Sequence, residues 1–384
     1  MPEKIYLMSP GPTNIPENTL KAMQVRSMHH RSDEFSALLM RLVTNLQAVF
    51  QTTSPILPLH CTGRGAIEAT IVNLLRQDDE IISVCNGRFG RMYAEIAEKF
   101  GITVHRICDD WEKDVDLEEL RTALEMFPKA KAITAVHCET STAVINNIKS
   151  IAQLGHEYDK LIMVDCVSSL GGMPFHCDEW EVDVAITASQ KALMGPTGLS
   201  FVTLSERAWK ATETSDFPKS YLDLSAVLKN LQGNKPETPG STPVQLVAAM
   251  VNSTDMILQE GLEAVWERHR RLSGGIKAAL EALGLRLFPD VVAERSDTLS
   301  AAWMPGGLTP AHLNQPMKDM FGIVAKGGLL QYKEKILRVG HMGDFFQFDA
   351  MAFVAALEFA MRRIGRIEKM GLGLEALDRF IEDK

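Results

Sequence analysis

Short apolar runs alternate with amphipathic segments along the chain as far as Leu204. The apolar runs are rich in branched residues and show no clean two-residue alternation, which is typical of strands covered by helices on both faces. They predict strands at Ile56–His60, Glu80–Val84, Thr103–Ile107, Ala132–Val136, Leu161–Val164, Val184–Ile186 and Leu199–Leu204. The amphipathic segments predict helices at Phe35–Phe50, Ala66–Leu75, Met92–Phe100, Leu117–Glu125 and Ile148–His156. This alternation predicts an α/β fold with a mostly parallel sheet.

The alternation stops after Leu204, and the rest of the chain has a different pattern. Residues 215–242 are rich in Pro, Gly, Asn and Lys and predict an irregular segment, which a long helical region at Val244–Leu283 follows. Beyond it we expect strands at Leu285–Phe288, Thr298–Trp303 and Ile336–Val339, and helices at Pro310–Met320 and Ala350–Ile364. This pattern predicts a smaller α+β domain. We divide the chain into an N-terminal arm (1–14), a large domain (15–258) and a small C-terminal domain (259–384).

Composition narrows the class of protein. A chain of 384 residues that are 46% hydrophobic is long enough to bury a large core, and its formal net charge of −9 argues against nucleic acid or an anionic membrane as a partner. The six cysteines form no C-x-x-C pair, and no apolar run suits a secretory signal or a membrane span. We therefore expect a cytoplasmic protein. The histidines show no metal-ligand spacing, so we expect no metal.

A lysine stands between two predicted strands. Lys191 follows Val184–Ile186 and precedes Leu199–Leu204, across a turn that contains glycine and proline. An unpaired buried ammonium costs several kcal/mol, so a lysine in this place suits a chemical role. A desolvated lysine has a lowered pKa and can form a Schiff base. We therefore predict that Lys191 carries pyridoxal phosphate, although this stretch alone leaves an ordinary surface lysine open.

A carboxylate follows another predicted strand. Asp165 comes directly after Leu161–Val164, and α/β sheets bind ligands at the carboxyl ends of their parallel strands. An acid that pairs with the pyridinium nitrogen of pyridoxal phosphate keeps the ring able to act as an electron sink. We assign this role to Asp165. The alternative is that it caps a helix or a turn.

Four further stretches follow strands and carry candidate ligand groups. Thr62-Gly63-Arg64-Gly65 opens a helix, where backbone N–H groups suit a phosphate. Phe89 is placed to stack on the cofactor ring, and Thr140 is placed to reach the ring oxygen or the phosphate. Arg338 lies close to glycines at a strand end and suits a clamp for a substrate carboxylate. Each has a plainer alternative: a tight turn, a core aromatic, a turn cap and a solvated arginine.

Together these stretches resemble the class V aminotransferases, which are fold type I pyridoxal phosphate enzymes with a seven-stranded sheet in the large domain. The resemblance is strongest to the alanine–glyoxylate and serine–glyoxylate (serine–pyruvate) aminotransferases. The matching segments occur in the family's order and cover nearly the whole chain. They are residues 10–14, 62–69, 86–90, 139–142, 165–172, 189–191 and 337–340.

The resemblance implies a role for individual residues of this chain. Lys191 is the Schiff-base lysine, Asp165 the partner of the ring nitrogen, and Val167 and Phe89 cover the two faces of the ring. The phosphate is held by Thr62, Gly63, Arg64 and Gln190, and across a homodimer interface by Thr238 and Ser241. The remaining roles fall to Thr140, which binds the ring hydroxyl or the phosphate side, and to Arg338 and Gly11 in the substrate site.

The reaction that the resemblance implies is ping-pong transamination of a small amino acid, alanine or serine, with glyoxylate or pyruvate. Arg338 is the only evident carboxylate clamp, which favours a monocarboxylic donor. Three alternatives stay open: an aminotransferase for 2-aminoethylphosphonate or ureidoglycine, a desulfurase-like lyase, and a non-catalytic subunit of a larger complex. All six cysteines precede Lys191, which argues against the lyase. The presence of Lys191, Asp165 and Arg338 argues against the non-catalytic subunit.

Overall fold

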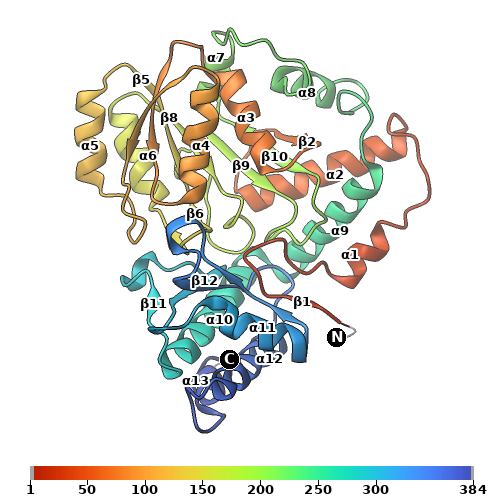
Figure 1. Cartoon of the computed structure of the whole chain (residues 1–384). Helices are drawn as coiled ribbons and strands as arrows, with labels where there is room; N and C mark the ends of the chain where they lie inside the picture. The colour runs from red at the N-terminus through yellow and green to blue at the C-terminus, as the bar shows by residue number, and fades with distance from the viewer. Residues whose placement is uncertain (1–3, 382–384) are drawn as a thin grey trace.

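A seven-stranded sheet forms the centre of the N-terminal part of the chain in the computed structural model, which describes residues 4–381 (Figure 1). Residues 1–3 of the predicted arm and residues 382–384 lie outside this range. Four strand pairs are parallel, and only β10 runs antiparallel to its neighbours β2 and β9. The mostly parallel sheet is therefore confirmed. In spatial order the strands are β2 (Ile56–Leu59), β10 (Ser200–Leu204), β9 (Val184–Ala188), β8 (Leu161–Asp165), β5 (Ala130–Val136), β3 (Glu80–Val84) and β4 (Thr103–Ile107).

Helices cover both faces of this sheet (Figure 1), which explains why β2, β8, β9 and β10 are buried along their whole length. Ser32 caps the second helix, because its hydroxyl accepts a hydrogen bond from the N–H of Phe35 at 3.1 Å. The helices are α1 (Glu17–Ala22), α2 (Asp33–Phe50), α3 (Gly63–Leu74), α4 (Arg88–Lys99), α5 (Leu117–Met126), α6 (Ile148–Glu157), α7 (Glu206–Thr212), α8 (Leu224–Leu231) and α9 (Val244–Glu260).

One prediction for the middle of the chain was wrong in part, and another is confirmed with a break inside the region. The segment 215–242 is not wholly irregular, because Asp223 caps α8 and the buried residues Leu224, Val227 and Leu231 face the core along one side of it. The helical region Val244–Leu283 is two helices, α9 and α10 (Leu262–Ala282), with Gly261 between them at φ 92°. A residue without Cβ takes this left-handed conformation readily.

The C-terminal part forms a second, four-stranded sheet with its own hydrophobic cluster. Its strands are all antiparallel and lie in the order β11 (Leu287–Phe288), β12 (Leu299–Trp303), β15 (Ile336–Gly340) and β14 (Lys326–Gly327). Around it lie α10, α11 (Pro310–Phe321), α12 (Gln347–Arg363) and the unpredicted α13 (Leu372–Ile381). The exact domain boundary at 258/259 stays a prediction.

Short elements connect the two parts. The N-terminal strand β1 (Tyr6–Leu7) pairs in parallel with β13 (Ile323–Val324), although it is far from it in sequence. A small hairpin of β6 (Cys138–Glu139) and β7 (Val144–Ile145) follows β5, and Val144 forms a bridge with Arg295 of the C-terminal part. Between residues 4 and 381, no helix combines the length and the hydropathy that a membrane crossing needs.

Candidate active site

A cavity lies at the carboxyl edge of the large sheet and is built from segments that follow its strands. β2 runs in the same direction as β9 because β10 is antiparallel to both. The segments after β2, β3, β5, β8 and β9 therefore meet at one edge, where α/β sheets bind ligands. Every residue predicted to hold the cofactor, except Thr238 and Ser241, lines this cavity of about 200 Å³. Its lining is Thr62, Gly63, Arg64, Phe89, Met92, Val136, Cys138, Thr140, Asp165, Val167, Gln190 and Lys191.

Lys191 is buried in the turn between β9 and β10. Its ammonium donates hydrogen bonds to Ser168 Oγ at 3.2 Å and to the carbonyl oxygen of Pro10. Burial lowers the pKa of Lys191 to about 8, because the charged form loses its hydration. At neutral pH about a tenth of the side chains is then uncharged, compared with roughly one in three thousand for an exposed lysine. An uncharged amine is what nucleophilic attack on an aldehyde requires.

The N-terminal arm crosses this lysine. Thr13 donates from its N–H to the carbonyl oxygen of Gln190 at 3.2 Å and from its hydroxyl to that of Lys191 at 3.0 Å. Gly11 has φ 124°, and a Cβ at this position would lie 2.5 Å from both Cε and Nζ of Lys191. Gly11, which we predicted in the substrate site, therefore packs directly on the lysine, and a side chain there would displace it.

Asp165 ends β8 and is buried in the same cavity. One of its carboxylate oxygens accepts a hydrogen bond from the N–H of Val167 at 2.8 Å. Burial raises the pKa of Asp165 to about 6, since the ionised form is poorly solvated there. A cationic group placed against this carboxylate would restore its charge.

The start of α3 offers free polar groups on another side of the cavity. Thr62 is the N-cap residue of α3, and its hydroxyl makes no capping hydrogen bond. A Cβ on Gly63 would lie 2.9 Å from the Val167 side chain, so this backbone comes close to the cavity wall. The side-chain oxygen of Gln190 is buried and has no partner among the described residues. An uncapped helix start suits an anion, whereas the Gln190 oxygen is an acceptor and requires a donor.

Arg338 lies in β15 of the second sheet and is buried. Its guanidinium donates to the carbonyl oxygen of Thr140 at 2.6 Å and to that of Gly327 at 2.9 Å. Burial lowers the pKa of Arg338 to about 10, which leaves it charged at neutral pH. Its charge adds to burial in lowering the pKa of Lys191. Arg338 lines a neighbouring hollow rather than the Lys191 cavity itself.

Comparison with known proteins identifies the family to which the chain belongs. The family model described as aminotransferase class-V matches residues 5–329. The chain belongs to the class V aminotransferases. A curated relative from Synechococcus sp. (strain PCC 6716), named as the small subunit of a soluble hydrogenase, is 36% identical over 99% of this chain and 99% of its own.

Two further relatives carry aminotransferase names. The serine–glyoxylate aminotransferase of Arabidopsis thaliana is 32% identical over 99% of this chain and 96% of its own. The crystal structure of an alanine–glyoxylate aminotransferase from Nostoc sp. has a TM-score of 0.90 and 32% identity. It covers 94% of this chain and 96% of that one. The expected fold and enzyme class are confirmed.

Pyridoxal 5′-phosphate is the cofactor of this family, and the cavity of this aminotransferase fits it. The uncapped start of α3 at Thr62 is available to a phosphate. Within residues 4–381 the buried carboxylate of Asp165 has only a backbone donor, so it suits a protonated ring nitrogen. Lys191 is the buried amine that the aldehyde requires.

Thr238 and Ser241 lie away from this cavity within one chain. Thr238 is buried, and its hydroxyl contacts Thr242 and, at 3.5 Å, Nε2 of His60. Ser241 lines a separate hollow together with His60 and Tyr221. That Thr238 and Ser241 bind the phosphate in the site of a partner subunit stays a prediction.

Glu139 is a buried residue that contacts the Phe89 segment, and no role was predicted for it. Its buried carboxylate accepts hydrogen bonds from the N–H groups of Phe89 at 3.0 Å and Gly90 at 3.1 Å. The other oxygen accepts from the N–H and the hydroxyl of Ser141 at 3.0 and 2.6 Å. Glu139 thereby fixes the backbone of the first turn of α4, which carries Phe89. The signal in the sequence was an acidic residue inside a stretch of small residues after a strand.

Ser168 and Cys138 were also missed. Ser168 Oγ contacts both Lys191 Nζ and the hydroxyl of Thr140. Cys138 donates its thiol to Ser296 Oγ at 3.1 Å, and burial raises its pKa to about 11, so it remains a thiol at neutral pH. No local sequence signal distinguishes these residues, because their contacts come from distant segments.

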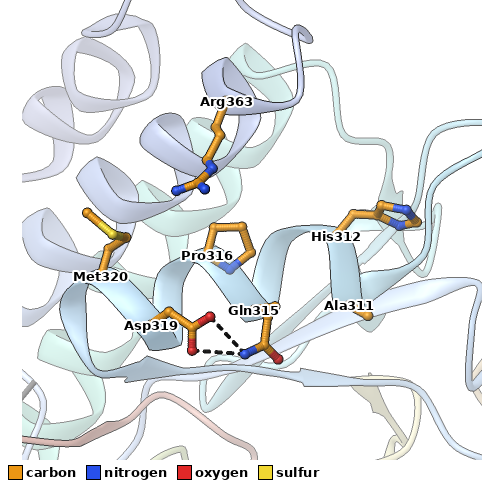
Figure 2. Close-up of a pocket in the computed structure, with 7 residues that line it drawn as sticks. All are labelled: Ala311, His312, Gln315, Pro316, Asp319, Met320 and Arg363. Atoms are coloured by element: carbon orange, nitrogen blue, oxygen red, sulfur yellow. Dashed lines mark hydrogen bonds between the residues drawn. The ribbon is translucent and has the colours of Figure 1, made fainter. Parts of the chain in front are cut away.

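A larger hollow on the C-terminal part lacks the lysine that the Lys191 cavity contains. Between α11 and α12 a surface hollow of about 520 Å³ is lined by residues that include Pro316, Met320 and Arg363 (Figure 2). Its acid, Asp319, already accepts hydrogen bonds from Gln315 at 2.8 and 2.9 Å. It contains no lysine, so the smaller Lys191 cavity is the candidate active site.

Proposed function

We propose that this aminotransferase transfers the amino group of a small amino acid, alanine or serine, to glyoxylate. The observation that carries the proposal is a buried, partly neutral Lys191 in one cavity with a buried Asp165, close to the buried cation Arg338. The serine–glyoxylate and alanine–glyoxylate aminotransferases among the relatives support this choice of acceptor.

The chain has a group for each end of pyridoxal phosphate. The phosphate would be held by Thr62, Gly63, Arg64 and Gln190. The two ring faces would be covered by Val167 and Phe89, and the ring nitrogen would pair with Asp165. All these residues line the one cavity. When bound, the cofactor supplies an electron sink for the bond that breaks at the α-carbon of the amino acid.

Lys191 moves the proton in this proposal. With its pKa near 8, the amine can both accept and return a proton at neutral pH. Ser168 Oγ, at 3.2 Å, and the carbonyl oxygen of Pro10 hold the released amine in place. Thr140 contacts Ser168 and is tied through its carbonyl to Arg338, so the lysine and the arginine share one hydrogen-bonded framework.

Arg338 binds the substrate carboxylate. Two of its donors are used by the carbonyl oxygens of Thr140 and Gly327, which orients the planar group and leaves Nη2 for a ligand. We also propose that the enzyme is a cytoplasmic homodimer in which Thr238 and Ser241 complete the partner's phosphate site.

The test measures glycine formed from glyoxylate with alanine or serine as donor. We expect the wild-type enzyme to form glycine and Lys191→Ala to lose this activity by several orders of magnitude. Borohydride reduction and peptide mapping should place a pyridoxyl label on residue 191. A wild-type rate in Lys191→Ala, or a label elsewhere, would refute the assignment.

The hydrogenase name of one relative gives a second reading, in which the protein is a non-catalytic subunit. The shared cavity of Lys191 and Asp165 speaks against it. A purified protein that shows no visible absorption, and none after added pyridoxal phosphate, would favour that reading.

A further inference from the structure

The N-terminal arm connects the two parts of the molecule (Figure 1). Residues 6–8 follow the C-terminal part, where β1 pairs in parallel with β13 and the N–H of Met8 donates to the carbonyl oxygen of Val324 at 3.0 Å. Residues 9–13 then cross the turn between β9 and β10, which carries Lys191. The arm therefore contacts both parts of the chain over a short distance in sequence.

The arm also lies against the strand that carries Arg338. Gly340 ends β15, and its N–H donates to the carbonyl oxygen of Met8 at 2.8 Å. A Cβ on Gly340 would lie 2.1 Å from the carbonyl oxygen of Ser9, so the backbones approach this closely only because the residue is glycine. Arg338 belongs to the same strand. A displacement of the arm is therefore felt beside the candidate substrate clamp as well as at the Lys191 turn.

One contact of the arm depends on the chemical state of Lys191. Among the described residues, the Lys191 ammonium has two hydrogen-bond acceptors, the carbonyl oxygen of Pro10 and Ser168 Oγ, and its N–H groups suffice for both. When the neutral amine condenses with the aldehyde of pyridoxal phosphate, a C=N bond forms and both amine hydrogens leave with the aldehyde oxygen as water. The nitrogen then carries one N–H if protonated and none otherwise. It can no longer serve Pro10 and Ser168 together, and the cofactor's own ring oxygen competes for the hydrogen that is left.

We propose that residues 6–13 of the arm respond to the covalent state of Lys191: the arm is held against the site while Lys191 is a free amine, and it is released when Lys191 is bound to the cofactor. In the proposed reaction the donor amine takes the place of Lys191 on the cofactor and gives its two hydrogens to the lysine nitrogen, which frees the lysine. The lysine is also free with pyridoxamine phosphate, which has no covalent bond to the chain. The arm therefore closes the site when only non-covalent contacts keep the cofactor there. This inference rests on the proposed function and adds a conformational step to it.

The first experiment measures hydrogen exchange of the arm amides in two forms of the protein, which carry pyridoxal phosphate or pyridoxamine phosphate. The N–H groups of Met8 and Thr13 donate to the carbonyl oxygens of Val324 and Gln190. We expect both amides to exchange about tenfold more slowly with pyridoxamine phosphate, the effect typical of one hydrogen bond from a charged donor. In Lys191→Met the two forms should exchange at the same rate. Equal rates in the two wild-type forms, or a difference that persists in Lys191→Met, would overturn the inference.

The second experiment measures how long the protein retains each cofactor on gel filtration. Asn14 closes the arm, because its Oδ1 accepts from the N–H of Leu7 at 2.9 Å and its Nδ2 donates to the carbonyl oxygen of Leu7 at 3.2 Å. Asn14→Ala should speed the loss of pyridoxamine phosphate about tenfold and leave retention of pyridoxal phosphate unchanged, because the bond to Lys191 holds it. The matched control is Asn18→Ala, which removes the same amide from an exposed position of α1 and should change neither.

The outcomes separate this inference from the proposed function, since neither measurement requires turnover. Equal loss of both cofactors from Asn14→Ala, or unchanged retention of both, overturns the role of the arm even if glycine is formed from glyoxylate. Absence of a borohydride label at Lys191 overturns the proposed function instead.

Discussion

Replacing Lys191 by methionine should stabilise the cofactor-free protein near neutral pH, although it removes the amine that the proposed reaction needs. Burial moves the pKa of this lysine from an ordinary 10.5 to about 8. Each pKa unit between the folded and the unfolded state corresponds to 1.36 kcal/mol. The buried ammonium therefore costs the folded protein about 3 kcal/mol at pH 7. Methionine has a similar length and removes this cost.

The sign of the pH dependence follows from the same two pKa values. Below about pH 8 the lysine is protonated in both states, so its full cost is present. Between about pH 8 and 10.5 the folded state releases its proton while the unfolded state keeps it, so wild-type stability rises relative to Lys191→Met. At pH 9.5 the advantage of the variant should have fallen to about 1.4 kcal/mol, less than half of its value at pH 7.

The assay is urea unfolding of both proteins, freed of cofactor, at pH 7 and pH 9.5. Lys129→Met is the control, because Lys129 is exposed and its replacement should change stability little at either pH. A Lys191→Met protein no more stable than wild type at pH 7 would refute the reasoning. An advantage of equal size at both pH values would show that packing, rather than the buried charge, is responsible.

Three further substitutions test neighbouring contacts. Gly11→Ala should weaken retention of pyridoxal phosphate at least tenfold, because the added Cβ would lie 2.5 Å from Lys191 Nζ. Visible absorbance after gel filtration measures the retained cofactor, and full loading of the variant would contradict the prediction. Glu139→Gln should lower the free energy of unfolding by about 3 kcal/mol, because an amide cannot accept all four hydrogen bonds. Hydrogen exchange of the Phe89 and Gly90 amides should become faster. Unchanged exchange at these amides would rule out the positioning role of Glu139. The pKa of Asp165 rises from 3.8 to about 6 on folding, so the cofactor-free protein loses stability as the pH rises through this window. Asp165→Asn should therefore stabilise it by about 3 kcal/mol at pH 7 and by nothing below about pH 4, and a gain that persists at low pH would count against a charge effect.

Most strands of the large sheet could be predicted because they are short, apolar and buried, whereas β4 at the sheet edge is largely half-buried or exposed. Their predicted ends agree with the structure to within a few residues, as in β3 and β4. The helices α7, α8 and α13 were missed: α7 has only 7 residues, α8 has its apolar positions inside a segment rich in Pro, Gly and Asn, and α13 follows a segment without a clear helix start. The break between α9 and α10 depends on one glycine, which a periodicity argument passes over.

The candidate site was predictable where a residue type and its place after a strand were enough. Lys191, Asp165 and Thr62 are of this kind, because parallel strands bring their carboxyl ends to one edge. Thr238 and Ser241 are the opposite case: the sequence places them in a motif, and one chain alone keeps them out of the cavity.

The sequence by itself determined the alternation of strands and helices, the enzyme family and the residues whose chemistry suits the cofactor. Only the tertiary structure decided which groups surround them. Pro10 and Ser168 meet the lysine ammonium, Glu139 holds the Phe89 turn, and Met8 of the arm bonds the strand of Arg338. The physical reason is that local pattern reports burial and periodicity within one segment, whereas a pKa, an orientation or a pair of charges depends on segments that only folding brings together.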